Sequence, residues 1–358
     1  MQQKKSHGTP SFGGAPLPRE SLDVDAVMNE LSLQEKIQLL SGVDNWHLKE
    51  IRRFGIPAIR VSDGPNGIRG TKMFNGSPAA CLPCGTALAA TWDVDMIRRG
   101  GELQAREAIA KGVSVVLGPT VNTQRSPMGG RGFESFSEDP VLAGAMAAAT
   151  IQGIQSKGLS TAIKHFVCND QEHERMKQDS RVSARALREI YLLPFQIALR
   201  QSRPWVFMSS YNRVNGVHAS ENAWLLRDVL RGEWGFDGLV MSDWTGTYST
   251  AEAIKAGLDL EMPGPSLMRG SLVNHALVSG KLSKDDIDVC VRRILQFINR
   301  VTPLGIPSHA PERTIDPKQT AAELRQLASS SIVLLRNQDN VLPFAKEKSV
   351  CPLSIFIS

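Results

Sequence analysis

Short apolar runs alternate with helix-period segments along the middle of the chain. The runs are Ala58–Ser62, Val113–Leu117, Thr161–Ile163, Trp205–Ser209, Gly238–Met241 and Leu258–Met262. Helix-period segments lie between most of them, at Asp93–Lys111, Ala184–Arg200 and Leu225–Trp234. Strands that are apolar on both faces and separated by helices are typical of a parallel sheet covered by helices. The pattern therefore predicts an α/β fold. Six candidate strands over about 240 residues favour an irregular TIM-like (β/α)8 barrel over a doubly wound sheet.

The composition and the periodicity of the chain change on both sides of this alternating region. Residues 1–22 are polar and rich in Gly, Pro and Lys, and we predict a disordered tail there. The barrel is expected over residues 23–300. Residues 301–320 are Pro-rich and aperiodic, which predicts a linker. Residues 321–358 are expected to be the incomplete start of a second α/β domain, because about 40 residues cannot build a core alone.

Three local patterns predict individual helices and strands near these domain boundaries. Ser32 and Glu35 have the spacing of a capping box and predict a helix that runs to about Leu40. Residues 321–329 are helical in pattern, and Ser331–Leu335 is a strand-like run. The apolar side chains of these last two segments would normally pack on a second domain, so we expect the chain to self-associate through them.

Composition excludes several classes of protein. The net charge of +5 comes from 41 basic and 36 acidic residues spread along the chain, so no nucleic-acid partner is expected. No apolar run is long enough to cross a membrane, and no secretory signal precedes residue 20, which favours a cytoplasmic location. Five cysteines are too few and too scattered for a disulfide framework. Cys81 and Cys84 have metal or redox spacing, but no second pair completes a site, so no metal is predicted.

Polar residues follow strand after strand. Asp63, the pair Lys164 and His165, Tyr211 and Asp243 all lie at or just beyond the end of an apolar run. In a barrel these ends share one face, and catalytic groups collect on that face. Each could also be an ordinary loop residue, but the recurrence favours a site.

Asp243 is the strongest candidate for chemistry. A carboxylate at the end of a buried strand, followed by Trp244, suits a nucleophile that attacks the anomeric carbon of a sugar while the indole supports the ring. The alternative is an N-cap that opens the next helix. Lys164 and His165 could hold sugar hydroxyls. Asp63 lies on a tight turn, where it could bind hydroxyls or satisfy turn amides.

A Gly-rich stretch between Asn122 and Pro140 adds further charged groups. Arg125 and Arg131 are candidate donors to a ligand. The acidic residues Glu134, Glu138 and Asp139 could pair with them, and structural ion pairs explain most of these charges as well as ligand contacts do.

Several long segments, in this order, resemble glycoside hydrolase family 3, and most closely its fungal β-glucosidases. The segments are DGPNGIR, NTQRSPMGGRGFESFSEDP, KHFVCNDQEHER, LREIYLLPF, FMSSYNRVNG and LLRDVLRGEWGFDGLVMSDW. The resemblance covers almost the whole chain, and it implies a retaining hydrolase of terminal β-D-glucosyl residues that acts in the breakdown of cellulose, β-glucan or glucosides. Many relatives act outside the cell, so secretion is an alternative location.

The same resemblance implies roles for individual residues. Asp243 would form the glycosyl-enzyme bond, and Tyr211 would sit beside it. The residues that would contact the nonreducing-end glucose are Asp63, Arg131, Lys164, His165, Met208 and Trp244. No cofactor or metal is implied, and the partner is a β-glucoside or β-gluco-oligosaccharide.

The acid/base residue cannot be named from this sequence. A retaining glycosidase needs a second carboxyl roughly 5 Å from the first, and in this branch of the family it comes from the second domain. One alternative is therefore a truncated chain that binds sugar without cleaving it. Another is the lone-barrel β-N-acetylglucosaminidase branch, whose acid/base is a loop His. That pattern is absent here, because Arg181 follows Asp179-Ser180 where that branch has His, and His173 is the only other His on the loop.

Overall fold

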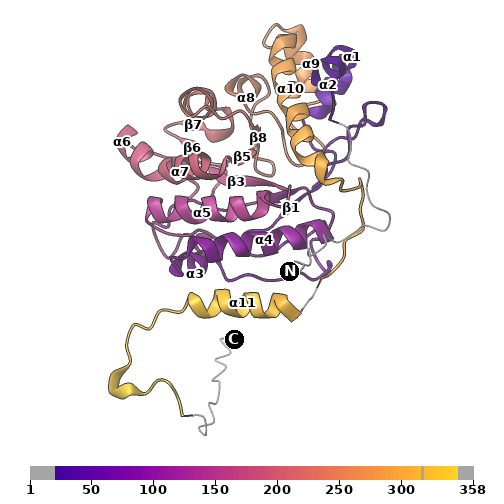
Figure 1. Cartoon of the computed structure of the whole chain (residues 1–358). Coiled ribbons are helices and arrows are strands. Elements are labelled where there is room, and N and C mark those ends of the chain that lie inside the picture. Colours follow the sequence, from indigo (N-terminus) through magenta and orange to yellow (C-terminus); the bar gives the residue numbers. More distant parts are fainter. Residues whose placement is uncertain (1–20, 316–317, 346–358) are drawn as a thin grey trace.

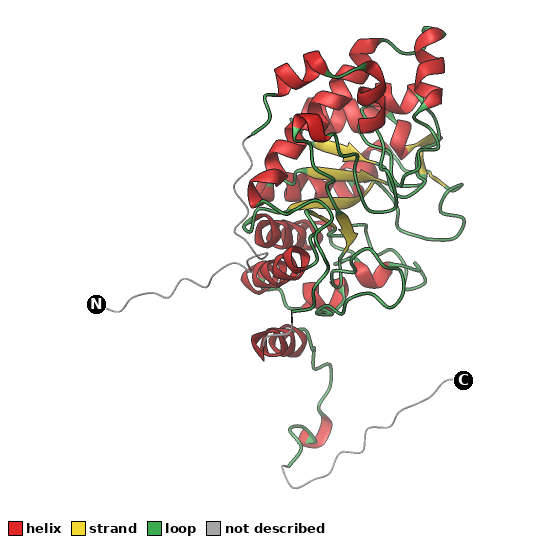
Figure 2. Ribbon diagram, turned by 90° about the vertical axis from the view of Figure 1, so that its right-hand side faces the viewer, coloured by secondary structure: helices red, strands yellow, loops and turns green. Residues whose placement is uncertain are grey.

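Five parallel strands form the centre of the fold. The computed structural model describes residues 21–315 and 318–345. The strands β1 (Val61–Asp63), β2 (Val115–Leu117), β3 (Ser160–Phe166), β5 (Val206–Ser209) and β8 (Leu239–Met241) lie side by side in this order. Every neighbouring pair is parallel. Figure 2 shows these strands at the centre with helices around them. The predicted α/β barrel is confirmed.

Three short segments close the sheet into a ring. Met241 at the end of β8 bridges Leu260, and the next residue, Glu261, bridges Ser41, both in parallel. The chain then doubles back, with Gly42 opposite Leu48 and His47 opposite Arg60, which immediately precedes β1. The apolar run Leu258–Met262 therefore takes part in the barrel by single bridges rather than as a full strand. Part of the closure is antiparallel, which makes the barrel irregular, as predicted.

Helices cover the outside of this ring (Figure 1). They are α1 (Val24–Glu30), α2 (Leu33–Leu39), α3 (Gly85–Ala90), α4 (Val94–Ala110), α5 (Pro140–Gln155), α6 (Ala184–Ala186), α7 (Leu193–Ser202), α8 (Ala251–Ala256), α9 (Ser271–Val278), α10 (Lys284–Val301) and α11 (Lys318–Ser330), with the π-helices η3 (Leu187–Tyr191) and η5 (Trp224–Glu233). Single 3-10 turns are η1 (Arg52–Phe54), η2 (Gly132–Glu134), η4 (Ala219–Glu221), η6 (Thr302–Leu304) and η7 (Gln338–Asn340). A small second sheet joins β4 (Asp179–Ser180), β6 (Arg213–Val214) and β7 (Val217–His218).

Local sequence explains where several helices begin and how they pack. Ser32 and Glu35 form the predicted capping box of α2, and Ser283 with Asp286 forms another on α10. The Ala- and Gly-rich α5 packs closely on α4. A Cβ at Gly101 or Gly153 would overlap backbone atoms of the facing helix, so this approach requires glycine. Most of α5 is therefore buried.

Successive residues of the central strands belong to two different clusters of buried apolar side chains. On β5, Val206 and Met208 belong to a cluster with α1, α2 and α10, whereas Phe207 packs with residues of α5 and α7. On β8, Leu239 and Val240 divide in the same way. Successive strand side chains point to opposite faces, so burial on both faces accounts for the unbroken apolar runs in the sequence.

The segments at the two ends of the barrel differ in part from expectation. Residues 1–20 of the predicted tail lie outside the described residues, but Leu22 exchanges two hydrogen bonds with Asn299 on α10. In the region predicted as a linker, α10 reaches Val301 and η6 follows it. The predicted strand Ser331–Leu335 is wrong. This segment is a loop, because no strand of the described chain lies beside it to complete a backbone ladder.

Helix α11 packs back on the barrel. Leu327 is buried in the cluster that also holds Leu82 and Ile97, and Leu324 packs against its edge. Figure 1 shows α11 in yellow along the outer side of α4. In contrast, Ile332, Leu334 and Leu335 are 77%, 61% and 92% exposed. Among the described residues, no helix is both long and apolar enough to cross a membrane.

Candidate active site

One open cavity lies at the carboxyl ends of the central strands, the face where barrel enzymes place their sites. Its volume, counted out to open solvent, is about 770 Å³. All eight residues predicted from the sequence line it: Asp63, Arg131, Lys164, His165, Met208, Tyr211, Asp243 and Trp244. Asn45, Trp46, Arg69, Met73 and Arg175 complete the wall. The barrel thus brings residues from five separate stretches of the sequence into one cavity.

Asp243 follows β8 and is 7% exposed. Its Oδ1 accepts a hydrogen bond of 2.7 Å from the Trp244 amide, which fixes the plane of the carboxyl group. Its Oδ2 is buried and accepts no hydrogen bond from the described residues. Burial raises the pKa of Asp243, while the positive charges of Lys164 and Arg131 act against that rise. One carboxylate oxygen is therefore anchored, and the other has no hydrogen bond to hold it, in a residue that lines the cavity.

His165 is held as a neutral imidazole beside this carboxylate. Its Nε2 lies 3.5 Å from Asp243 Oδ2 and 3.2 Å from an Arg131 guanidinium nitrogen. Burial, aided by the charges of Arg131 and Lys164, holds the pKa of His165 well below its ordinary value. Since Arg131 can only donate, Nε2 accepts and Nδ1 carries the proton, which it donates to Asn122 Oδ1 at 3.2 Å. Asn122 also bonds both backbone groups of His165.

Lys164 and Asp63 form a second charged pair across the cavity. Lys164 Nζ lies 3.3 Å from Asp63 Oδ1, and Arg69 Nη1 lies 3.5 Å from Asp63 Oδ2. Lys164 is 3% exposed, whereas the Asp63 side chain is 41% exposed. The carboxylate is oriented by two cations and still faces the solvent of the cavity.

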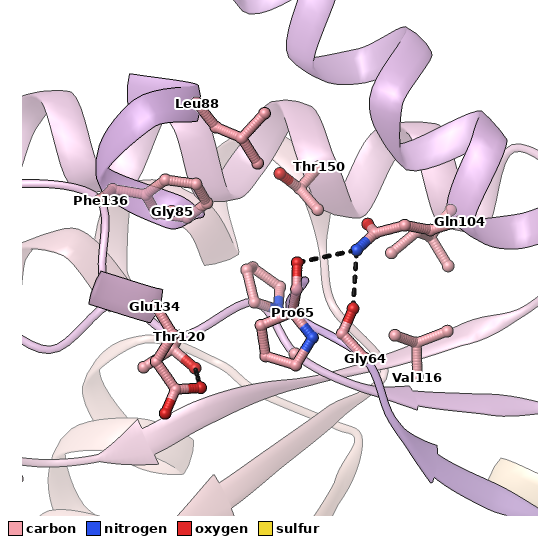
Figure 3. Close-up of a pocket in the computed structure, with 13 residues that line it drawn as sticks. Gly64, Pro65, Gly85, Leu88, Gln104, Val116, Thr120, Glu134, Phe136 and Thr150 are labelled. Carbon is pink, nitrogen blue, oxygen red and sulfur yellow. Dashed lines mark hydrogen bonds between the residues drawn. The ribbon is translucent and has the colours of Figure 1, made fainter. Parts of the chain in front are cut away.

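The turn that carries Asp63 is braced from behind (Figure 3). The buried Gln104 on α4 donates to the carbonyl of Gly64 at 2.7 Å and to that of Pro65 at 3.0 Å. These groups border a small internal cavity between α4, α5 and β2 that is separate from the open one. In the same view Thr120 donates to Glu134 at 3.1 Å. The other carboxylate oxygen of Glu134 accepts a hydrogen bond from Arg131.

Other charges of the Gly-rich stretch are structural. Arg125 pairs with Asp170 at 3.1 Å, and Asp139 caps the start of α5. Neither Arg125 nor Glu138 lines the open cavity. Of the two arginines singled out in the sequence, Arg131 alone reaches it.

Aromatic side chains shape the wall next to Asp243. Tyr211 donates its hydroxyl proton to the carbonyl of Trp244 at 3.0 Å. Trp244 donates from Nε1 to the carbonyl of Asn45 at 3.1 Å, and its ring lies 5.7 Å from that of Trp46. Both bonds keep the indole at the edge of the cavity. The sequence interpretation of Asp243 as a helix cap does not fit, since α8 begins only at Ala251.

Comparison with known proteins decides the family. Residues 20–297 match the domain described as Glycosyl hydrolase family 3 N terminal domain. This chain belongs to glycosyl hydrolase family 3.

Its relatives are longer proteins. It is 57% identical over 330 residues to a probable beta-glucosidase I of Emericella nidulans, a match that covers 92% of this chain and 39% of the relative. A probable beta-glucosidase I of Aspergillus fumigatus is 56% identical, with the same coverage of both chains. The chain therefore spans about two fifths of the length of these relatives.

Solved structures of the family have the same barrel. A beta-glucosidase from Kluyveromyces marxianus in complex with glucose has a TM-score of 0.90 and 52% identity, over 91% of this chain and 40% of that one. Beta-glucosidase 3B from Thermotoga neapolitana in complex with alpha-D-glucose has a TM-score of 0.84 and 38% identity, over 90% and 48% of the two chains.

The family 3 barrel also has cavity residues that sequence reasoning missed. Arg175 places its guanidinium carbon 4.5 Å over the ring of Tyr211 and donates to Glu172 at 2.8 Å. Arg69 and Arg175 both lie in segments that carried the resemblance, so the signal was present but unused. Trp46 and Asn45 had no such signal, because their place depends on a contact with Trp244 far along the chain.

Within the described residues, Asp63 and Asp243 are the carboxylates that line the cavity of this family 3 barrel. Asp63 is already paired with both Lys164 and Arg69. His173, the alternative acid/base, is exposed and does not line the cavity. No cluster of metal ligands occurs among the described residues.

Proposed function

We propose that this chain carries the nucleophile half of a retaining β-glucosidase that removes terminal β-D-glucosyl residues. One observation supports this most directly: Asp243 Oδ2 accepts no hydrogen bond from the described residues, while Lys164, His165, Arg131 and Asp63 converge on the same cavity. The bound sugars that are named for the Kluyveromyces marxianus and Thermotoga neapolitana relatives are both glucose.

The reaction follows from this arrangement. An ionised Asp243 oxygen bonds to the anomeric carbon as the bond from that carbon to the leaving-group oxygen breaks, and the leaving group takes the electron pair. Water then attacks the same carbon and releases Asp243 as a carboxylate. Two inversions give retention. Lys164 and Asp63 offer a donor and an acceptor to the sugar hydroxyls, and Trp244 offers an apolar surface to the ring.

Protonation of the leaving oxygen requires a second carboxyl group in the complete enzyme. We propose that this group does not come from the described residues, because the only other carboxylate in the cavity is the doubly paired Asp63. Removing general acid catalysis costs about 10²–10⁴ in rate for a poor leaving group. A dinitrophenolate leaving group needs little protonation, so it isolates the contribution of Asp243.

The stereochemistry of the product tests this proposal. With 2,4-dinitrophenyl β-D-glucoside, the first glucose seen by proton NMR is expected to be the β-anomer, and an Asp243→Ala variant is expected to release none. First formation of α-glucose would contradict a covalent intermediate. Equal turnover by Asp243→Ala would show that another group attacks.

We also propose that the chain associates with a second copy of itself through the apolar side chains at Ile332, Leu334 and Leu335. These are among the most exposed large apolar residues of the described chain. Contiguous exposed apolar residues are typical of interaction sites.

A further inference from the structure

Residues 307–314, which we call the strap, cross the outside of the barrel beside the loop 64–80. The strap follows η6 and lies beyond the residues that match the family domain. Ser308 Oγ accepts from the Ala58 amide at 3.1 Å, the Arg313 amide donates to the carbonyl of Ala110 at 2.9 Å, and Thr314 donates to that of Pro78 at 3.2 Å. Ala310 is 3% exposed and packs at the end of α4. The strap is therefore fixed at several points, unlike a linker.

Glu312 is the strap residue that accepts hydrogen bonds from the loop 64–80. Its Oε1 accepts two hydrogen bonds from Thr71, one from the amide at 2.7 Å and one from the hydroxyl at 2.6 Å. The carboxylate also lies against Gly70, whose φ of +84° favours glycine. The strap thus hydrogen-bonds Thr71 and contacts Gly70, the two residues that directly follow Arg69.

Lys111 holds the same loop from the inside. Its side chain is 1% exposed, and its ammonium group donates to the carbonyls of Ile68, Arg69 and Ser77. Burial lowers the pKa of Lys111, and the negative charge of Glu312 acts in the opposite direction. Lys111 and Glu312 therefore bind the loop from two sides, and their opposite charges attract each other across its backbone.

Arg69 stands between these two anchors. Its carbonyl accepts from Lys111, Thr71 two residues further on donates to Glu312, and its guanidinium lines the open cavity 3.5 Å from Asp63. We propose that Glu312 is a positioning residue of the active site, which acts through Arg69 to hold the sugar-binding face of the Asp63 turn. This inference rests on the proposed glucosidase function.

Covalent labelling separates binding from bond formation. The probe is 2,4-dinitrophenyl 2-deoxy-2-fluoro-β-D-glucoside, and the readouts are its inhibition constant KI and its limiting labelling rate. Glu312→Ala is expected to raise KI about tenfold, the equivalent of one hydrogen bond to a charged group, with a smaller change in the limiting rate. Glu312→Gln keeps an acceptor for Thr71 and is expected to restore most of the affinity.

Matched controls separate positioning from general loss of stability. Glu323→Ala removes the carboxylate of α11 that pairs with Arg106, away from the cavity, and is expected to leave KI unchanged. In an Arg69→Ala background, Glu312→Ala is expected to have no further effect on KI. Thr71→Val removes only the hydroxyl that Glu312 binds and is expected to raise KI in the same direction as Glu312→Ala.

The labelling results distinguish a failure of the proposed glucosidase function from a failure of the proposed role of Glu312. No labelling of the unmutated chain would overturn the glucosidase function itself. Normal labelling of that chain together with an unchanged KI in Glu312→Ala would overturn the role of Glu312. An equal rise in KI with and without Arg69 would also overturn it, because the effect would then not pass through Arg69.

Discussion

At the scale of residues, the environment of Asp243 combines an unfavourable burial with favourable charges. Its free oxygen faces His165, which is neutral and already accepts from Arg131, so the imidazole cannot donate to the carboxylate from Nε2. The support for negative charge comes from Lys164, the Trp244 amide, Arg131 and the nearby Tyr211 hydroxyl. An anion that is poorly solvated by the protein reacts more readily than one tied up by hydrogen bonds.

The pH dependence of labelling follows from this balance. The pKa of Asp243 is raised above the ordinary value of 3.8. Since the nucleophile must be ionised, the labelling rate is expected to fall about tenfold per pH unit below a midpoint that lies above 3.8. The burial of His165 moves its titration well below 6.5, so no inflection from this residue is expected near that pH. Rates measured from pH 3 to about 8 check both points, and a midpoint at or below 3.8 would contradict the first.

At the scale of elements, a buried charge cluster joins three parts of the barrel. Asp259 is fully buried and pairs with Arg231 on η5 at 2.6 Å and with Arg293 on α10 at 3.0 Å. It also accepts from the backbone amide of Val240 on β8. These bonds connect the helices outside the last strands to the sheet itself.

Breaking this cluster is expected to destabilise the fold. Asp259→Asn would leave two arginines with an uncompensated buried charge, which costs about 3–5 kcal/mol. The matched control is Asp237→Asn, which breaks an exposed pair with Arg300 and should cost under about 1 kcal/mol. Urea unfolding of both variants measures the difference, and equal costs would contradict this account of the cluster.

Elements with a strong local period could be predicted from the sequence. The five central strands and helices such as α4 were placed to within a few residues, because burial on both faces or on one stripe leaves a clear pattern. The closure of the ring through Ser41 and Leu48 could not, since single bridges leave no apolar alternation. Ser331–Leu335 failed for the opposite reason: a β-rich run forms a strand only beside a partner.

Those residues of the candidate site that lie at the ends of strands could be predicted from the sequence. Lys164 and His165 lie near the end of β3, and Asp243 follows β8, so their meeting follows from the barrel alone. Asp63 and Arg69 lie in one short segment, but in our proposal their ion pair depends on the anchors Lys111 and Glu312. Contacts of this kind join residues far apart in sequence, and no local pattern reports them.

At the scale of the whole molecule, the segment that follows α11 exposes apolar side chains to solvent instead of packing them on the barrel. Leu324 and Leu327 pack on the barrel, so only part of the predicted exposed surface is found. The segment at Ile332, Leu334 and Leu335 remains exposed.

Self-association is therefore expected to depend on that segment. Light scattering should show a concentration-dependent rise in mass for the chain, and Leu334→Asp with Leu335→Asp should suppress it. Val278, a 90% exposed apolar residue on α9, provides the control, because Val278→Asp should leave the mass unchanged. A monodisperse monomer at every concentration would contradict the proposal.

The central claim is that the carboxylate at position 243 forms the bond to the sugar. The most direct measurement is peptide mass spectrometry after reaction with 2,4-dinitrophenyl 2-deoxy-2-fluoro-β-D-glucoside. The account predicts one fluoroglucosyl group per chain, on the peptide that contains Asp243, and none in Asp243→Asn. A label on another residue, or no label on a folded chain that binds glucose, would contradict it.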